Sequence, residues 1–179
     1  MDTLGKTVSI IDSKVNSGAE GLLVQKAARL LDAGTSHEDV VAAIEATIPR
    51  TKIYVCLETL DYAVRGGRVS HSVGKIGRAI GLRPIMTIDP EGKGATFGAG
   101  LSKAAITKKI VKLVRATMGK KGVEAYCIVH ADNLPLAGVY REQLTAIVGR
   151  EPEYIDEISS IIAIHSGPGS VAVCVIEGS

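Results

Sequence analysis

Aromatic residues are scarce in this sequence, which has no tryptophan, one phenylalanine and five tyrosines. Proteins that stack single-stranded nucleic acid on aromatic rings need more of them, and so do membrane proteins with interfacial aromatic belts. No stretch of the chain approaches the roughly 18 consecutive apolar residues of a membrane-spanning helix. We therefore expect no nucleic-acid partner, no integral membrane association and a core built from aliphatic side chains.

Cysteine and histidine are also few and widely spaced. Cys56, Cys127 and Cys174 lie far apart in the chain, so neither a Cys-x-x-Cys metal site nor a disulfide framework is indicated. The four histidines are equally scattered and form no local metal-binding motif. We expect three buried thiols and no metal ion.

Local catalytic and nucleotide-binding motifs are missing as well. Residues 5–7 (GKT) lack the first glycine of a P-loop, and the glycine pairs within 98–100 and 167–169 lack the third glycine of a dinucleotide-binding loop. The sequence has no Gly-x-Ser-x-Gly elbow, His-Glu-x-x-His site or EF-hand loop. We therefore expect no catalytic residue and no cofactor, and enzymes defined by such motifs are not favoured.

The remaining composition is typical of a globular protein. Of the 179 residues, 46% are hydrophobic and 22% are charged, and 21 basic against 19 acidic side chains give a formal net charge of +2. This composition excludes disorder, and the balanced charge provides no overall attraction to nucleic acid or to an anionic membrane. The acidic start of the chain lacks the basic and apolar regions of a signal peptide, so we expect a cytoplasmic protein.

The first fifty residues predict one strand followed by two helices. Residues 7–11 (TVSII) form a short β-branched run, and residues 35–38 (TSHE) resemble a capping box that starts the second helix. Pro49 ends that helix, so we divide the chain into residues 1–50 and a second domain over 51–179. Because a single strand cannot form a sheet, the strand at 7–11 is expected to join strands supplied from elsewhere.

Beyond residue 50, hydrophobic periodicity and turn residues predict a mixed α/β arrangement. The expected strands cover residues 52–57, 83–88, 95–99, 125–130, 153–158 and 171–176. The expected helices cover residues 59–65, 73–80, a long segment capped by Ser102, and 134–148, and an apolar segment follows at 161–164. The fold class is therefore α/β, with a mixed α+β second domain.

Two short segments combine glycine with polar side chains. Residues 60–69 (LDYAVRGGRV) place two glycines beside Arg68, so that backbone N–H groups and a guanidinium can converge on an anion. A solvated basic turn is the alternative. Residues 164–169 (IHSGPG) deliver His165 and Ser166 to a rigid turn, where a purely structural histidine is the alternative. Together the two segments favour a carboxylate or phosphate site.

Several motifs occur in the order and spacing of one bacterial family. They are residues 8–13 (VSIIDS), 59–60 (TL), 66–68 (GGR), 83–85 (RPI) and 165–169 (HSGPG). On these residues the chain resembles the DegV family, which includes the fatty-acid-binding subunits of bacterial fatty acid kinase. The resemblance implies a two-domain, non-enzymatic protein that encloses a long-chain fatty acid between its domains. It also implies that the acyl carboxylate is presented to a separate ATP-dependent kinase.

The resemblance further implies roles for individual residues. The carboxylate would be bound by residues of the two glycine-containing segments, namely Gly67, Arg68, His165 and Ser166. A guanidinium and an imidazole suit a carboxylate that keeps its charge while its tail is dehydrated. The acyl tunnel needs aliphatic walls, and the candidates are Leu60, Ile76, Ile80, Leu82 and Ile85. The alternative for these five residues is that they only fill the core.

The chain departs from the family pattern in two places. The family's N-terminal domain normally begins further upstream, with hydroxyl-bearing loops that bind the carboxylate, so residues 1–50 are expected to be the remnant of that domain. A missing N-terminal half or a second copy of the chain would then complete the site. Residues 98–103 (GAGLSK) replace an Arg-Thr-rich segment associated with kinase docking, which weakens the expectation of a kinase partner. The basic run over 103–121 forms either a docking face or a solvated helix face.

Three classes of function remain open from the sequence. The leading hypothesis is a fatty-acid-binding protein that is incomplete in its N-terminal domain. The second is a ligand-free structural or regulatory module that keeps the same fold for interaction. The third is a hydrolase that uses His165 with Ser166, which is disfavoured because adjacent residues on a turn rarely aim at one another.

Overall fold

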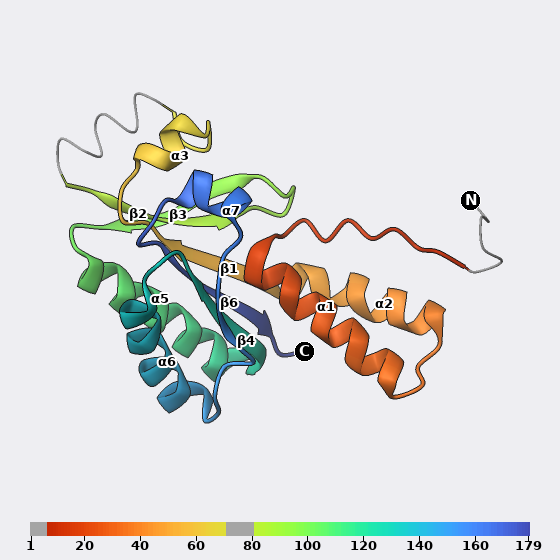
Figure 1. The fold of residues 1–179 in the computed structure, drawn as a ribbon. Helices are drawn as coiled ribbons and strands as arrows, with labels where there is room; N and C mark the ends of the chain where they lie inside the picture. The colour runs from red at the N-terminus through yellow and green to blue at the C-terminus, as the bar shows by residue number, and fades with distance from the viewer. Residues whose placement is uncertain (1–6, 71–80) are drawn as a thin grey trace.

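The computed structural model describes residues 7–70 and 81–179, which fold around one mixed β-sheet (Figure 1). The strands are β1 (Thr51–Cys56), β2 (Arg83–Ile88), β3 (Gly94–Gly100), β4 (Val123–His130), β5 (Ile155–Glu157) and β6 (Val171–Glu177). The helices are α1 (Ser17–Asp32), α2 (His37–Thr47), the 3-10 turn η1 (Ile48–Arg50), α3 (Asp61–Arg65), α5 (Lys103–Lys120), α6 (Leu134–Val148) and α7 (Ser160–Ser166).

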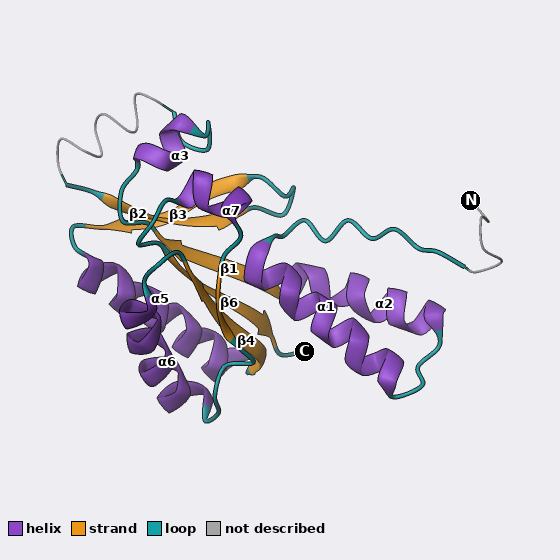
Figure 2. Cartoon of the chain, viewed as in Figure 1, coloured by secondary structure: helices purple, strands orange, loops and turns teal. Residues whose placement is uncertain are grey.

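The strands follow the spatial order β3-β2-β1-β6-β4-β5. Neighbouring strands are antiparallel except β4 and β5, which run parallel. The central strands β1, β6 and β4 are rich in valine, isoleucine, tyrosine and cysteine, residue types that pack well on a pleated surface. Helices cover both faces of the sheet (Figure 2), so these strands are buried on both sides and do not alternate between polar and apolar residues.

The alternation of side chains along each strand divides the interior into two layers. On one face, Tyr126 and Val173 belong to a core that packs against α5 and α6. On the other face, their sequence neighbours Cys127 and Cys174 pack against α1. The two faces therefore support different parts of the chain, and only the face beneath α1 also carries α3 and α7 beside it (Figure 1).

Local capping residues set the ends of the two long helices on the first face. The Ser102 hydroxyl accepts a hydrogen bond from the backbone N–H of Ala105 (3.1 Å) at the start of α5. Asn133 Oδ1 accepts from the Leu136 N–H (3.3 Å) at the start of α6. Gly149 ends α6 in the left-handed conformation, with φ of 79°. These signals are all local, which explains why both helices begin where the sequence predicts them and why α6 also ends there.

Ion pairs connect α1 and η1 to strand β4 and to the segment before β5. Lys26 pairs with Glu124, Arg29 pairs with Glu153, and Arg50 Nη1 lies 2.9 Å from Glu124 Oε2. Exposed pairs of this kind contribute little individually, so the apolar contacts of α1 with β4 and β6 provide most of its attachment. Helix α1 therefore packs directly on the sheet, and α2 packs on α1.

Residues 7–11 do not form the expected strand. They belong to a segment that runs away from α1 as an extended arm (Figure 1), and Val8 and Ile10 are 73% and 97% exposed. A strand requires a neighbouring strand to satisfy its backbone N–H and C=O groups. No strand in the described part of the chain pairs with this segment, so its β-branched composition produces no sheet.

Smaller differences concern the ends of elements. Helix α2 is capped by Ser36, whose hydroxyl accepts from the Asp39 N–H (3.2 Å), so the cap lies one residue after the expected Thr35. Helix α3 is shorter than expected, and β5 covers only part of the predicted 153–158 strand. The helix expected at 73–80 lies outside the described residues.

The described residues contain neither a membrane-spanning helix nor a cluster of metal-binding side chains. None of its helices has the length and hydropathy needed to cross a membrane. Across residues 7–70 and 81–179, histidine, cysteine, aspartate and glutamate side chains do not gather in a group of three that could hold a metal ion.

Candidate functional site

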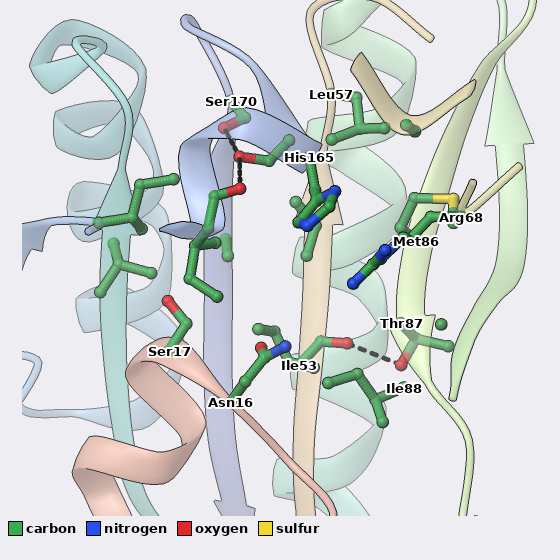
Figure 3. A pocket seen from close by; sticks show the side chains of 18 of the residues that line it. Asn16, Ser17, Ile53, Leu57, Arg68, Met86, Thr87, Ile88, His165 and Ser170 are labelled. Carbon is green, nitrogen blue, oxygen red and sulfur yellow. Dashed lines mark hydrogen bonds between the residues drawn. The ribbon is translucent and has the colours of Figure 1, made fainter. Parts of the chain in front are cut away.

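A cavity of about 220 Å³ lies on the α1 face of the sheet, between the N-terminus of α1 and the helices α3 and α7 (Figure 3). Its floor consists of side chains from four neighbouring strands: Ile53, Val55, Met86, Ile88, Val129 and Ala172. Most of the residues around it are aliphatic, so the cavity favours an apolar occupant.

The floor follows from strand geometry. Ile53 and Val55 are two residues apart on β1, and Met86 and Ile88 are two residues apart on β2, so each pair points to the same side of the sheet. Thr87 also reaches the cavity rim, where its hydroxyl donates a hydrogen bond to the Ile53 carbonyl (2.7 Å). Asn16 and Ser17 border the opposite end, at the start of α1 (Figure 3).

Arg68 enters the cavity lining from the turn that follows α3. Gly67 allows this turn because its φ is +73°, a left-handed conformation that residues with a Cβ rarely adopt. The Arg68 N–H donates to the Ala63 carbonyl (2.8 Å), and its Nη1 donates to the Gly66 carbonyl (2.7 Å). These bonds hold a largely exposed guanidinium at the edge of an apolar cavity.

His165 and Ser166 come from the last turn of α7 and also line the cavity. His165 Nδ1 is buried and has no hydrogen-bond partner. The Ser166 hydroxyl donates to the Ile162 carbonyl (3.3 Å) and accepts from the Ser170 hydroxyl (3.0 Å). The Ser166 proton is therefore committed to the backbone, which disfavours a hydrolase in which His165 activates Ser166.

A nearby carboxylate is neutralised by two cations. Glu58 packs beneath Gly169 and forms ion pairs with Lys103 and, at 3.5 Å, with Arg83. The hydrogen bond from Lys103 is the main reason that the pKa of Glu58 lies below its usual value. Because these two cations pair its charge, Glu58 adds no uncompensated negative charge next to the turn at residues 165–169.

The structure brings together part of the site expected from the sequence. Arg68, His165 and Ser166 border one cavity, while Gly67 shapes the turn that carries Arg68. Leu60 and Leu82 border a separate depression of about 150 Å³.

The other residues expected to line an acyl tunnel lie elsewhere. Ile85 is fully buried in the core under α5 and α6, on the opposite face of the sheet, and does not border the cavity. Ile76 and Ile80 lie outside the described residues. Met86 occupies the position expected for Ile85, because adjacent residues of a strand face opposite sides.

Comparison with known proteins identifies the relatives of this fold. The family model described as "Uncharacterised protein, DegV family" matches residues 1–178. The chain belongs to the DegV family. Among the family's curated members, the DegV domain-containing protein CA_C0701 of Clostridium acetobutylicum is 31% identical over 173 residues, covering 95% of this chain and 60% of that protein. The DegV domain-containing protein YejH of Lactococcus lactis is 30% identical, with coverages of 96% and 61%.

Solved DegV structures share the fold. The fatty-acid-binding DegV family protein SAG1342 of Streptococcus agalactiae superposes with a TM-score of 0.81 at 22% identity, over 97% of this chain and 61% of that chain. A stearic-acid-binding protein of Eubacterium ventriosum superposes with a TM-score of 0.82 at 19% identity, over 93% and 58% of the two chains. The Fak B3 protein of Streptococcus pneumoniae, loaded with linoleic acid, gives a TM-score of 0.80 at 22% identity, over 96% and 60%. This chain thus spans about 60% of the length of the DegV proteins that it matches.

Proposed function

We propose that this chain binds a long-chain fatty acid as a carrier and not as an enzyme, with the acyl tail in the apolar cavity and the carboxylate near Arg68 and His165. The observation that supports this proposal most directly is the convergence of these two residues. Arg68 Nη1 donates to the carbonyl of Gly66, and the His165 ring packs against the same glycine, so a cation and an imidazole meet at the edge of an aliphatic cavity.

The energetics of a fatty acid match this arrangement. Each methylene group that leaves water contributes about 0.8 kcal/mol, so the aliphatic floor favours the tail. A carboxylate that is drawn toward an apolar cavity loses hydration, and it needs charged or N–H donors at the cavity edge to offset that loss. Arg68 is always charged and offers several N–H donors in one plane, which suits the two oxygens of a carboxylate.

The cavity accounts for only part of a long acyl chain. Its volume of about 220 Å³ is below the roughly 300–1,000 Å³ that ligand sites usually enclose. We propose that further protein, either an N-terminal half or a second copy of this chain, covers the rest of the tail. Ile161 borders the cavity and is 74% exposed, and Ile164 on the same helix is 60% exposed, so these apolar side chains of α7 are suited to such a contact.

A more specific role is the presentation of the bound carboxylate to an ATP-dependent acyl kinase, which would place the protein in the cytoplasm. The support is the structural similarity to the Fatty Acid Kinase B3 protein of Streptococcus pneumoniae. Exposed basic residues on α5, among them Lys108, Lys112 and Arg115, are available for an acidic docking partner.

Displacement of a dansyl-labelled long-chain fatty acid by palmitate tests the binding proposal. The chain has no tryptophan, so protein emission interferes little with the probe. Arg68→Ala should weaken palmitate binding by about tenfold, the effect of losing one hydrogen bond to a charged group. Arg65→Ala is the matched control, because Arg65 lies in the same segment but stacks on Tyr62 and does not border the cavity. Equal losses in the two variants would contradict the role of Arg68.

The alternative function is a ligand-free interaction module, and the exposed apolar face of α7 is the observation that favours it. The same titration separates the two functions. If the wild-type chain shows no saturable binding of the probe and purifies without fatty acid by native mass spectrometry, the fatty-acid proposal is refuted and the interaction module is favoured.

A further inference from the structure

The segment at 60–69 and the segment at 164–169 touch through a glycine. A Cβ atom added to Gly66 would lie 2.2 Å from His165 Nδ1, closer than real Cβ atoms approach another atom, and 3.1 Å from His165 Cε1. The φ of Gly66 is −76°, which any residue adopts. Glycine at this position is therefore required by the imidazole that packs on it and not by the backbone conformation.

A second contact of the same kind runs in the opposite direction. A Cβ on Gly167 would lie 2.4 Å from Cδ2 of the Tyr62 ring. The guanidinium of Arg65 lies 5.2 Å from the centroid of that ring. One ring from each segment thus rests on a glycine of the other, and the two contacts hold α3 and α7 at a set separation.

The Gly66 contact also distinguishes the two nitrogens of the His165 ring. Nδ1 faces Gly66 and is buried without a hydrogen-bond partner. A buried N–H without an acceptor is rarer in proteins than a buried acceptor without a donor, so the proton of the neutral ring belongs on Nε2. His165 borders the cavity, and Nε2 is then the nitrogen that can donate a hydrogen bond there.

We propose that Gly66 is a positioning residue for ligand recognition: by seating the Nδ1 edge of His165, it directs the Nε2–H toward the ligand head group and makes the site selective for a carboxylate over an uncharged head group. This inference rests on the proposed fatty-acid function. It adds to that function the cause of head-group selectivity. A hydrogen bond to a charged acceptor is about twice as strong as one to a neutral acceptor, so the Nε2–H favours a carboxylate over an uncharged head group.

The first test compares a fatty acid with the primary alcohol of the same chain length, each displacing the dansyl-labelled probe. Gly66→Ala should weaken binding of the acid by about tenfold and leave binding of the alcohol within about twofold of wild type. Gly34→Ala is the control. A Cβ at Gly34 meets nothing within 4 Å but is strained by its φ of +80°, and Gly34 does not border the cavity, so this variant should lose stability and keep the wild-type ratio of acid to alcohol affinity. A Gly66→Ala protein with the wild-type ratio would overturn the inference.

The second test introduces Gly66→Ala into a His165→Ala background. Without the imidazole, the added Cβ has no ring to collide with, so the effect of Gly66→Ala on binding can be measured even where the single variant folds poorly. In that background, adding Gly66→Ala should change acid binding by less than about twofold, because Gly66 acts through the ring. A further tenfold loss in the double variant would show that Gly66 acts on the ligand by another route.

The third test needs no ligand. Long-range proton–nitrogen NMR spectra separate protonated from unprotonated ring nitrogens, and the loss of one signal set in His165→Ala assigns His165 among the four histidines. We expect an unprotonated Nδ1 in the neutral ring and displaced His165 signals in Gly66→Ala, with wild-type signals in Gly34→Ala. A protonated Nδ1, or His165 signals that do not move in Gly66→Ala, would overturn the inference even if fatty acids bind. Absence of saturable fatty-acid binding to the wild-type chain would instead refute the proposed function, and with it the head-group role.

Discussion

Ala172→Leu should fill the candidate cavity and exclude part of an acyl tail. Ala172 lies on the central strand β6, borders the cavity and is 6% exposed. A leucine there adds three carbon atoms at a point where the wild-type protein has empty space. The substitution leaves Arg68 and His165 in place, so it tests where the tail lies separately from how the head group is bound.

The expected magnitude follows from the volume removed. Three added carbons displace about three methylene groups of the ligand, and at about 0.8 kcal/mol each the loss is about 2.4 kcal/mol, or roughly sixtyfold in affinity. Acids shorter by a few carbons lose less, because they do not reach the filled region. Stability should be unchanged or slightly higher, since the added side chain enters a cavity and displaces no packed neighbour.

The assay is displacement of the dansyl-labelled fatty acid by a series of saturated acids, together with urea unfolding. Ala137→Leu is the matched control, because Ala137 on α6 is fully buried in the core on the other face of the sheet. The same chemical change at that packed position should cost about 1–3 kcal/mol in stability and leave the order of chain-length preference as in wild type.

Two results would refute this reasoning. If Ala172→Leu destabilises the protein as much as Ala137→Leu does, the space beside Ala172 is not available to a ligand. If stability is kept but palmitate affinity stays at the wild-type value, the tail of the fatty acid does not occupy the cavity.

The remaining predictions concern stability. Because the folded-state pKa of Glu58 is lowered by its bond with Lys103, this pair stabilises the protein above the unfolded-state pKa and loses its effect as the pH falls through the folded value. Glu58→Gln should therefore cost less than about 1 kcal/mol at neutral pH and nothing at about pH 2 in urea unfolding, and an equal cost at both pH values would contradict the assignment. Gly18→Ala should destabilise the protein, since its Cβ would lie 2.8 Å from Cys127 Sγ, whereas Gly119→Ala, which meets nothing within 4 Å in helix α5, should stabilise it by about 0.5–1 kcal/mol in thermal unfolding. Stability changes of the same sign in the two glycine variants would show that crowding between residue 18 and Cys127 does not determine the effect of Gly18→Ala.

Elements with signals at both ends were predictable from the sequence. The strand at 83–88 and the helix at 134–148 appear with the expected bounds, and the helix capped by Ser102 begins where the hydroxyl predicts it. Turn and cap residues act within a few positions of where they stand, so their effect is present in the local sequence.

The strand expected at 7–11 shows the limit of local signals. Its composition is that of a strand, yet a strand exists only where another strand satisfies its backbone. The candidate site shows the same limit. Alternation indicates that Ile85 and Met86 face opposite sides of β2, but it does not reveal which side carries a cavity and which carries the core under α5.

By itself, the sequence determined the six strands of the sheet, the long helices and the two segments that hold Arg68 and His165, since these depend on neighbouring residues. The tertiary structure alone decided that both side chains reach one cavity, that Met86 and Ala172 form its floor, and that Gly66 supports the His165 ring. Those relations join residues that are far apart in the chain, and periodicity predicts burial without naming the partner. Packing of α3 and α7 on the same face of the sheet supplies the partner, and with it the site.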